Sequence, residues 1–69
     1  MAQTFFDIRI TGGDDKRIVG LWCNLTPLRR PQAEKMAAAE TARGLEVEIV
    51  PTRNTLWEAT YGDKDKAVR

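Results

Sequence analysis

Alternating apolar and polar residues predict two half-buried β-strands in this chain. Within residues 4–11, Phe6, Ile8 and Ile10 share one side of an extended chain, and the opposite side is mainly polar. Residues 45–50 alternate in the same way, with Leu45, Val47 and Ile49 on one side and glutamates on the other. Each segment therefore fits a strand that buries one face and exposes the other.

A third segment, residues 16–24, is apolar on both faces. Residues 12–15, which precede it, are glycines and aspartates and favour a turn, so we expect a hairpin with the first strand. Its apolar side chains divide into Val19, Leu21 and Cys23 on one side and Ile18 and Trp22, flanking Gly20, on the other. Burial on both faces is typical of such strands, so we expect another molecule to cover the second face.

The remaining pattern predicts one helix and one further strand. Residues 31–43 begin with a proline, contain five alanines and are followed by Gly44, which can end a helix by adopting a left-handed backbone conformation. Residues 51–54 have turn chemistry, and residues 56–61 place Trp57, Ala59 and Tyr61 on one face of a predicted fourth strand. Residues 62–69 are highly charged and predict a flexible tail.

The predicted fold is a small α+β domain with the order ββαββ, spanning residues 1–61 and followed by the tail at residues 62–69. A helix between the second and third strands makes these two parallel in direction, so the first strand fits between them, antiparallel to both. The sheet is then antiparallel-rich, with three to four strands and one helix on one face. The other face is expected to be open.

Composition limits how so small a chain can be stabilised and where it acts. The 69 residues include one cysteine and no histidine, so neither an internal disulfide nor a structural zinc site of the usual kind is expected. No secretory signal or membrane-spanning run is visible, and a lone thiol suits a reducing interior, so we expect a cytoplasmic protein without membrane partners. Association with a partner is a remaining means of stabilisation.

The sequence offers no ordinary catalytic group, so we expect neither enzymatic activity nor a cofactor. Nucleophilic catalysis needs a base, and Cys23 within an apolar strand is predicted to be a core residue with a raised pKa. Glu46 and Glu48 share a face of one strand and are expected to pair with Arg9. A metal-dependent enzyme using Asp14 and Asp15 is the least favoured alternative, because such sites need further ligands.

The favoured hypothesis is a protein-binding module, a small intracellular adaptor or inhibitor of the kind that phages and other mobile elements often encode. It rests on the strand that is apolar on both faces, the large aromatic residues and the net charge of only +1. The open sheet face, centred on Ile18, Gly20, Trp22 and Phe5, would contact a partner protein or form a homodimer seam. Pairing of an edge strand with a partner is a second route. The predicted partner-binding residues are Phe5, Ile18, Trp22, Arg29, Arg30, Trp57 and Tyr61.

The alternative hypothesis is a small nucleic-acid-binding regulator. Arginines around the sheet and the start of the helix would contact phosphates, while Trp22 or Tyr61 would stack on bases. The predicted residues are Arg9, Arg17, Arg29, Arg30 and Arg53. This hypothesis ranks second because the chain lacks the basic excess of most nucleic-acid-binding domains.

Overall fold

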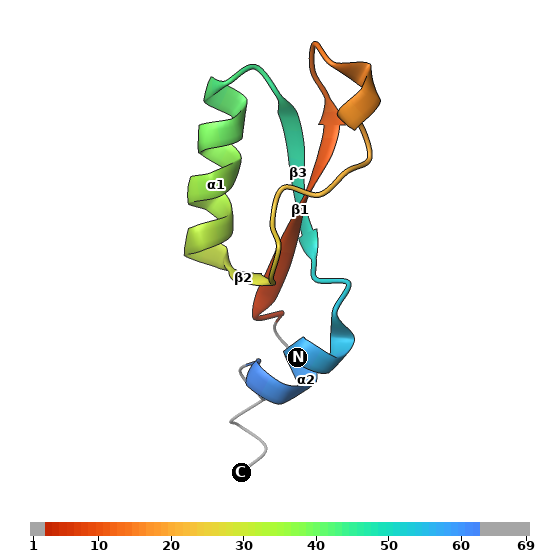
Figure 1. Cartoon of the computed structure of the whole chain (residues 1–69). Coiled ribbons are helices and arrows are strands. Elements are labelled where there is room, and N and C mark those ends of the chain that lie inside the picture. Colours follow the sequence, from red (N-terminus) through yellow and green to blue (C-terminus); the bar gives the residue numbers. More distant parts are fainter. Residues whose placement is uncertain (1–2, 63–69) are drawn as a thin grey trace.

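The computed structural model describes residues 3–62 and shows a small α+β fold (Figure 1). Its sheet has three strands in the order β2-β1-β3, with β1 antiparallel to both neighbours. The elements in chain order are β1 (Phe5–Gly12), the 3-10 helix η1 (Lys16–Ile18), β2 (Leu28–Arg29), α1 (Arg30–Ala42), β3 (Glu46–Pro51) and α2 (Thr55–Tyr61). The central position of the first strand is confirmed.

The core lies between the sheet and α1, and the alternation in β1 builds it. Phe6 and Ile8 from β1 pack with Ala33 of α1, and all three side chains are buried. Val47 and Ile49 of β3 pack against the same cluster, as the period of two predicts. The small side chain of Ala33 lets the helix lie close to the sheet, so α1 covers one face of β1 and β3.

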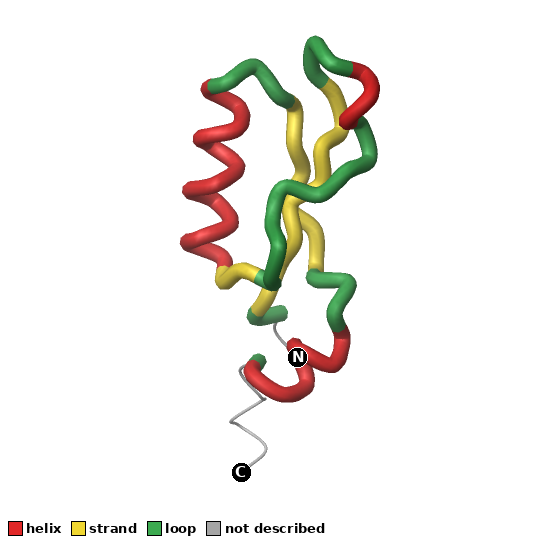
Figure 2. Tube along the Cα trace, in the orientation of Figure 1, coloured by secondary structure: helices red, strands yellow, loops and turns green. Residues whose placement is uncertain are grey.

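The prediction of a regular strand at residues 16–24 is wrong. Lys16–Ile18 forms a 3-10 helix instead, and residues 19–27 form an irregular segment that runs beside β1 (Figure 2). Asp15 caps the 3-10 helix by accepting a hydrogen bond from the backbone N–H of Arg17. The segment still pairs with β1, because Ile10 donates to the carbonyl of Leu21 and Cys23 donates to the carbonyl of Ile8.

Gly20 explains why this pairing is irregular. Its backbone N–H donates to the carbonyl of Ile10, while the N–H of Ile10 bonds to the next residue, Leu21. Two residues therefore oppose one, with Gly20 at a φ of 95°. This is the arrangement of a β-bulge whose first residue is a left-handed glycine. The ladder then ends at Asn24, and the chain returns to β1 only at β2.

The predicted fourth strand is also wrong, because residues 55–61 form the helix α2. Asn54 caps it: its side-chain oxygen accepts a 2.9 Å hydrogen bond from the backbone N–H of Trp57. α2 lies past the end of the sheet where β1 begins and β3 ends (Figure 1). None of the helices in residues 3–62 is both long and apolar enough to cross a membrane. The predicted tail, apart from Gly62, falls outside the described residues.

Candidate functional site

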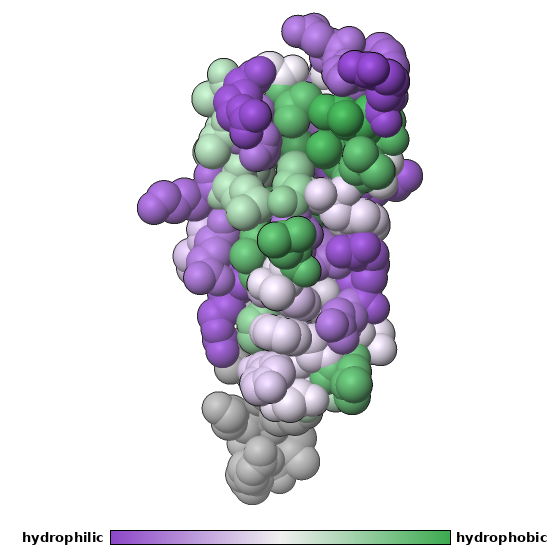
Figure 3. Space-filling model, in the orientation of Figure 1, coloured by the Kyte–Doolittle hydropathy of each residue, from purple (hydrophilic) through white to green (hydrophobic). Residues whose placement is uncertain are grey.

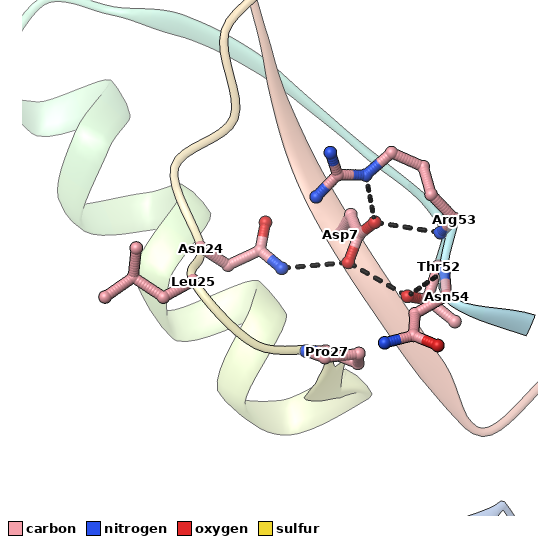
Figure 4. Close-up of a pocket in the computed structure, with 7 residues that line it drawn as sticks. All are labelled: Asp7, Asn24, Leu25, Pro27, Thr52, Arg53 and Asn54. Atoms are coloured by element: carbon pink, nitrogen blue, oxygen red, sulfur yellow. Dashed lines mark hydrogen bonds and ion pairs between the residues drawn. The ribbon is translucent and has the colours of Figure 1, made fainter. Parts of the chain in front are cut away.

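A buried carboxylate, that of Asp7, holds three separate segments together (Figure 4). It accepts hydrogen bonds from the side-chain amide of Asn24 at 2.8 Å and from the Thr52 hydroxyl at 3.1 Å. Arg53 donates to it twice, from its backbone N–H at 2.9 Å and from Nε at 2.7 Å. The centre of the sheet is thereby joined to the irregular segment and to the turn before α2.

The hydrogen bonds to Asp7 make it a structural residue. Burial by itself would raise the pKa of this carboxyl, but the hydrogen bonds from Arg53, Asn24 and Thr52 outweigh burial and leave the pKa below its ordinary value of 3.8. The group is therefore ionised at neutral pH and saturated with donors. Neither property suits a general acid or base, which needs a pKa near the working pH and access to substrate.

A polar pocket of about 270 Å³ opens beside this carboxylate. Asn24 lines it, with its Oδ1 accepting from the N–H of Ile8 and its Nδ2 donating to Asp7 and to the carbonyl of Thr26. Asn24 is buried, and both ends of its amide are engaged in these hydrogen bonds. The pocket is lined by Asp7, Asn24, Leu25, Pro27, Thr52, Arg53 and Asn54.

Three apolar side chains of the irregular segment are exposed, and we call them the apolar edge: Val19, Leu21 and Leu25. Their exposed fractions are 41%, 54% and 101%. Figure 3 shows apolar surface gathered over this segment, and Figure 4 shows Leu25 pointing away from Asp7. The chain from residue 18 to residue 28 contains no charged residue, although 30% of all residues are charged. The apolar edge is thus a surface with little polar interruption.

The structure divides the predicted partner-binding residues into separate places. Phe5 is buried rather than exposed, because Trp57 of α2 packs edge-on against it with ring centroids 6.2 Å apart. Tyr61 is exposed and stacks beside Trp57 at 4.8 Å. Trp22 is half-buried on the sheet face opposite α1, where the guanidinium of Arg53 lies 3.8 Å from its ring centroid. Ile18 is half-buried in η1.

The predicted phosphate-binding arginines do not form one patch. Arg29 and Arg30 lie at the start of α1, with guanidinium groups over the rings of Phe5 and Phe6. Arg17 is at η1, where it pairs with Asp15 at 3.0 Å. Arg9 and Arg53 lie on the face opposite α1, and Arg53 is engaged by Asp7. Arg9 faces Glu48 across the strands but forms no ion pair with it, contrary to the expectation.

The candidate catalytic groups are no better placed for chemistry. Burial raises the pKa of the Cys23 thiol, and the nearby charge of Glu40 raises it further against the opposing effect of Arg43. Cys23 packs against the core cluster, as expected. Asp14 and Asp15 lie in the loop before η1, and no group of three or more potential metal ligands occurs among residues 3–62.

Sequence reasoning singled out neither Leu21 nor Leu25. Leu21 belongs to the predicted strand at residues 16–24, whose helix-facing side the sequence leaves open, and Leu25 lies just beyond that strand. The absence of charge between residues 18 and 28 was the signal that identifies the whole segment. Comparison with known proteins adds no functional information: the chain matches no protein-family model, no curated protein and no solved structure.

Proposed function

We propose that the chain is a non-catalytic protein-binding module, a cytoplasmic adaptor or inhibitor that binds its partner through the apolar edge. The observation that carries the proposal is the row of exposed apolar side chains at Val19, Leu21 and Leu25 on an uncharged segment. This surface replaces the face around Phe5 and Trp22 that the sequence favoured. The polar pocket beside Leu25 adds a place for a polar partner group at the rim.

The energetic gain from covering the apolar edge is large for a domain of this size. Burying one leucine side chain fully contributes about 1.5–3 kcal/mol, so Leu21 and Leu25 together account for a few kcal/mol of binding free energy. The buried apolar residues of the described chain are few, namely Phe5, Phe6, Ile8, Ile10 and Ala33. Contact with a partner therefore extends a core that is small by itself.

The irregular segment is held in place before any partner arrives. Hydrogen bonds of 2.7–2.9 Å join Gly20, Leu21 and Cys23 to β1. The Asn24 side chain takes over where this ladder stops, bonding to Ile8 and Asp7. Because the backbone is already ordered, binding loses less conformational entropy than it would for a flexible loop.

The test compares wild type with a Leu21→Ser and Leu25→Ser double variant in affinity capture from host lysate, with and without nuclease. Leu56→Ser is the matched control, because Leu56 is 75% exposed on α2 but lies outside the apolar edge. We expect a protein that wild type and Leu56→Ser retain equally and that the double variant loses. Equal capture by all three would contradict the proposal, provided that circular dichroism shows all three folded.

Two other occupants of the apolar edge are outcomes of the same test. A homodimer would appear as twice the monomer mass in light scattering at the concentrations used, and the double variant would then be monomeric. Capture that disappears with nuclease would favour the nucleic-acid hypothesis. Such binding would also weaken steeply as salt increases, whereas an apolar contact would not.

A further inference from the structure

β3 forms the outer edge of the described sheet. The alternation of hydrogen bonds along the strands shows which of its backbone groups are free. In β1, the backbone groups of Ile8 and Ile10 bond to the irregular segment. Alternate residues of a strand bond to opposite sides, so Phe5, Asp7 and Arg9 bond toward β3. The 3.1 Å hydrogen bond from the N–H of Thr52 to the carbonyl of Phe5 agrees with this alternation.

The same alternation shows where the backbone N–H and C=O groups of β3 point. Val50 pairs with Asp7 and Glu48 pairs with Arg9, so these two β3 residues direct their N–H and C=O groups at β1. Val47 and Ile49 direct theirs outward. Pro51 has no N–H and closes the row. Among residues 3–62, no hydrogen bond is formed by the outward groups of Val47 and Ile49, and a fourth strand could pair with them.

The side chains along this edge differ between its two faces. Val47 and Ile49 are half-buried toward α1, where they pack against the core cluster. Glu46 and Glu48 are exposed on the opposite face, and neither carboxylate lies within ion-pair distance of a cation in residues 3–62. Within the described part of the chain, the β3 edge therefore presents two unpaired negative charges, two residues apart, beside free backbone groups.

These charges select what can pair with the edge. In an antiparallel pair of two β3 strands centred on Glu48, this glutamate would lie directly opposite its copy, which is destabilising. Centring the pair on Val47 would place Glu46 opposite Glu48 in both directions. Centring it on Ile49 avoids the like charges but sets Val47 opposite Pro51, which has no N–H to donate. A strand with basic residues opposite Glu46 and Glu48 would instead gain two favourable cross-strand pairs. A second copy therefore gains less from this edge than a basic partner strand does.

We propose that the β3 edge binds an extended segment of a partner protein in which basic residues alternate with apolar ones. The segment would add a fourth strand next to β3, with its basic side chains opposite Glu46 and Glu48 and its apolar side chains beside Val47 and Ile49. This surface is separate from the apolar edge, since β1 lies between the two. A chain with both surfaces can contact two partners, or one partner at two places.

The test measures fluorescence anisotropy of a labelled, capped peptide, Thr-Lys-Val-Lys-Val-Thr, against the full chain. A Glu46→Gln and Glu48→Gln variant is compared with an Asp14→Asn and Glu34→Gln control, which changes the net charge by the same amount at exposed positions elsewhere. Two cross-strand charge pairs together correspond to roughly three- to tenfold in affinity. We expect a loss of that size in the first variant and less than about twofold in the control.

N-methylated peptides separate strand addition from mere charge attraction. In a bound strand, the N–H groups of alternate peptide residues face β3, and methylating these amides removes them. Methylating the remaining amides removes only N–H groups that point away from β3. We expect one methylated peptide to lose binding and the other to retain it. Equal affinity of both, or of a peptide with glutamate in place of lysine, would overturn the proposal. The Leu21→Ser and Leu25→Ser variant should bind the peptide like wild type, so this test stands apart from that of the apolar edge.

Discussion

Asn24 donates a 2.8 Å hydrogen bond to the carboxylate of Asp7, and both side chains are buried. The bond joins the central strand to the segment that carries the apolar edge. Asn24 also replaces a backbone partner, because its Oδ1 accepts from the N–H of Ile8 where the regular ladder ends. The position of Leu25, the next residue along the chain, therefore depends on a side-chain interaction made beneath it.

Replacing Asp7 with asparagine should cost about 3 kcal/mol of unfolding free energy. The carboxylate accepts from four donors, whereas an amide supplies one oxygen and turns its own N–H groups toward donors. Urea denaturation measures the change. Asp15→Asn is the control, because the Asp15–Arg17 pair is exposed and should change stability by less than about 0.5 kcal/mol. An equally small loss at Asp7 would show that its hydrogen bonds contribute little.

The lowered pKa of Asp7 predicts how stability depends on pH. The unfolded chain has the ordinary pKa of 3.8, so below that pH it takes up a proton at Asp7 more readily than the folded chain does. The stabilisation by Asp7 is complete above about pH 5 and is lost as the pH falls below about 4, toward the folded pKa. Unfolding free energies of wild type should therefore drop more steeply in this range than those of Asp7→Asn. Parallel curves would contradict the shift.

The sequence predicted those parts of the fold in which the local pattern, such as alternation or a helix-ending residue, matches the packing in the structure. Alternation with one buried face holds in β3 and in β1 from Ile8 onward, although Phe5 and Asp7 are buried on the other face of β1. The helix α1 has a proline at its start and a glycine after its end. The segment after β1 departs from the prediction, although its apolar run suits a regular strand. Gly20 at positive φ and the side-chain bond of Asn24 break that regularity, and neither is visible as periodicity.

The candidate site was harder to predict because it depends on contacts distant in sequence. Residues 56–61 have strand-like alternation, yet the Asn54 cap favours a helix, and Glu58 then bonds to the start of β1. That docking buries Phe5 under Trp57, which removes Phe5 from the surface. Tyr61 lies in the same helix and stays exposed, so the docking of α2 buries one of the predicted aromatic residues and leaves another at the surface.

Gly20→Ala should destabilise the chain by about 1–2 kcal/mol. A Cβ at this position meets nothing within 4 Å, so the cost comes from the backbone, whose φ of 95° disfavours L side chains. Gly20→Asn is the comparison, because asparagine tolerates this region better and should cost less. Thermal unfolding of both variants shows which of the two is less stable. If alanine and asparagine were both neutral, the bulge would not need a left-handed residue.

The thiol of Cys23 should react slowly with iodoacetamide. The thiolate is the reactive form, and burial together with the charge of Glu40 raises the pKa of this thiol. The reaction rate should therefore begin to rise at a higher pH than it does for a cysteine in an unstructured peptide. Urea-unfolded protein is the control and should show ordinary reactivity. A folded rate equal to the unfolded rate at each pH would show that the fold protects the thiol in neither way and would contradict this prediction.

Glu58 attaches α2 to the sheet, and its replacement should loosen that helix. Its carboxylate accepts from the backbone N–H groups of Phe5 at 2.8 Å and Thr4 at 3.2 Å, and from the side chain of Gln3 at 2.9 Å. Glu58→Gln removes the charge and one acceptor oxygen. Hydrogen bonds to charged groups are among the stronger ones, so we expect a loss of about 1–2 kcal/mol.

Tryptophan fluorescence can show whether this loss is local to α2. In a Trp22→Phe background only Trp57 reports, and it packs against Phe5 next to the Glu58 contact. We expect its emission to shift to longer wavelength in Glu58→Gln at urea concentrations where circular dichroism still shows a folded chain. Glu34→Gln, which alters an exposed pair with Arg30, should leave the emission unchanged. Coincident transitions in both signals for Glu58→Gln would mean that α2 unfolds only together with the sheet, and that the carboxylate stabilises the whole domain equally.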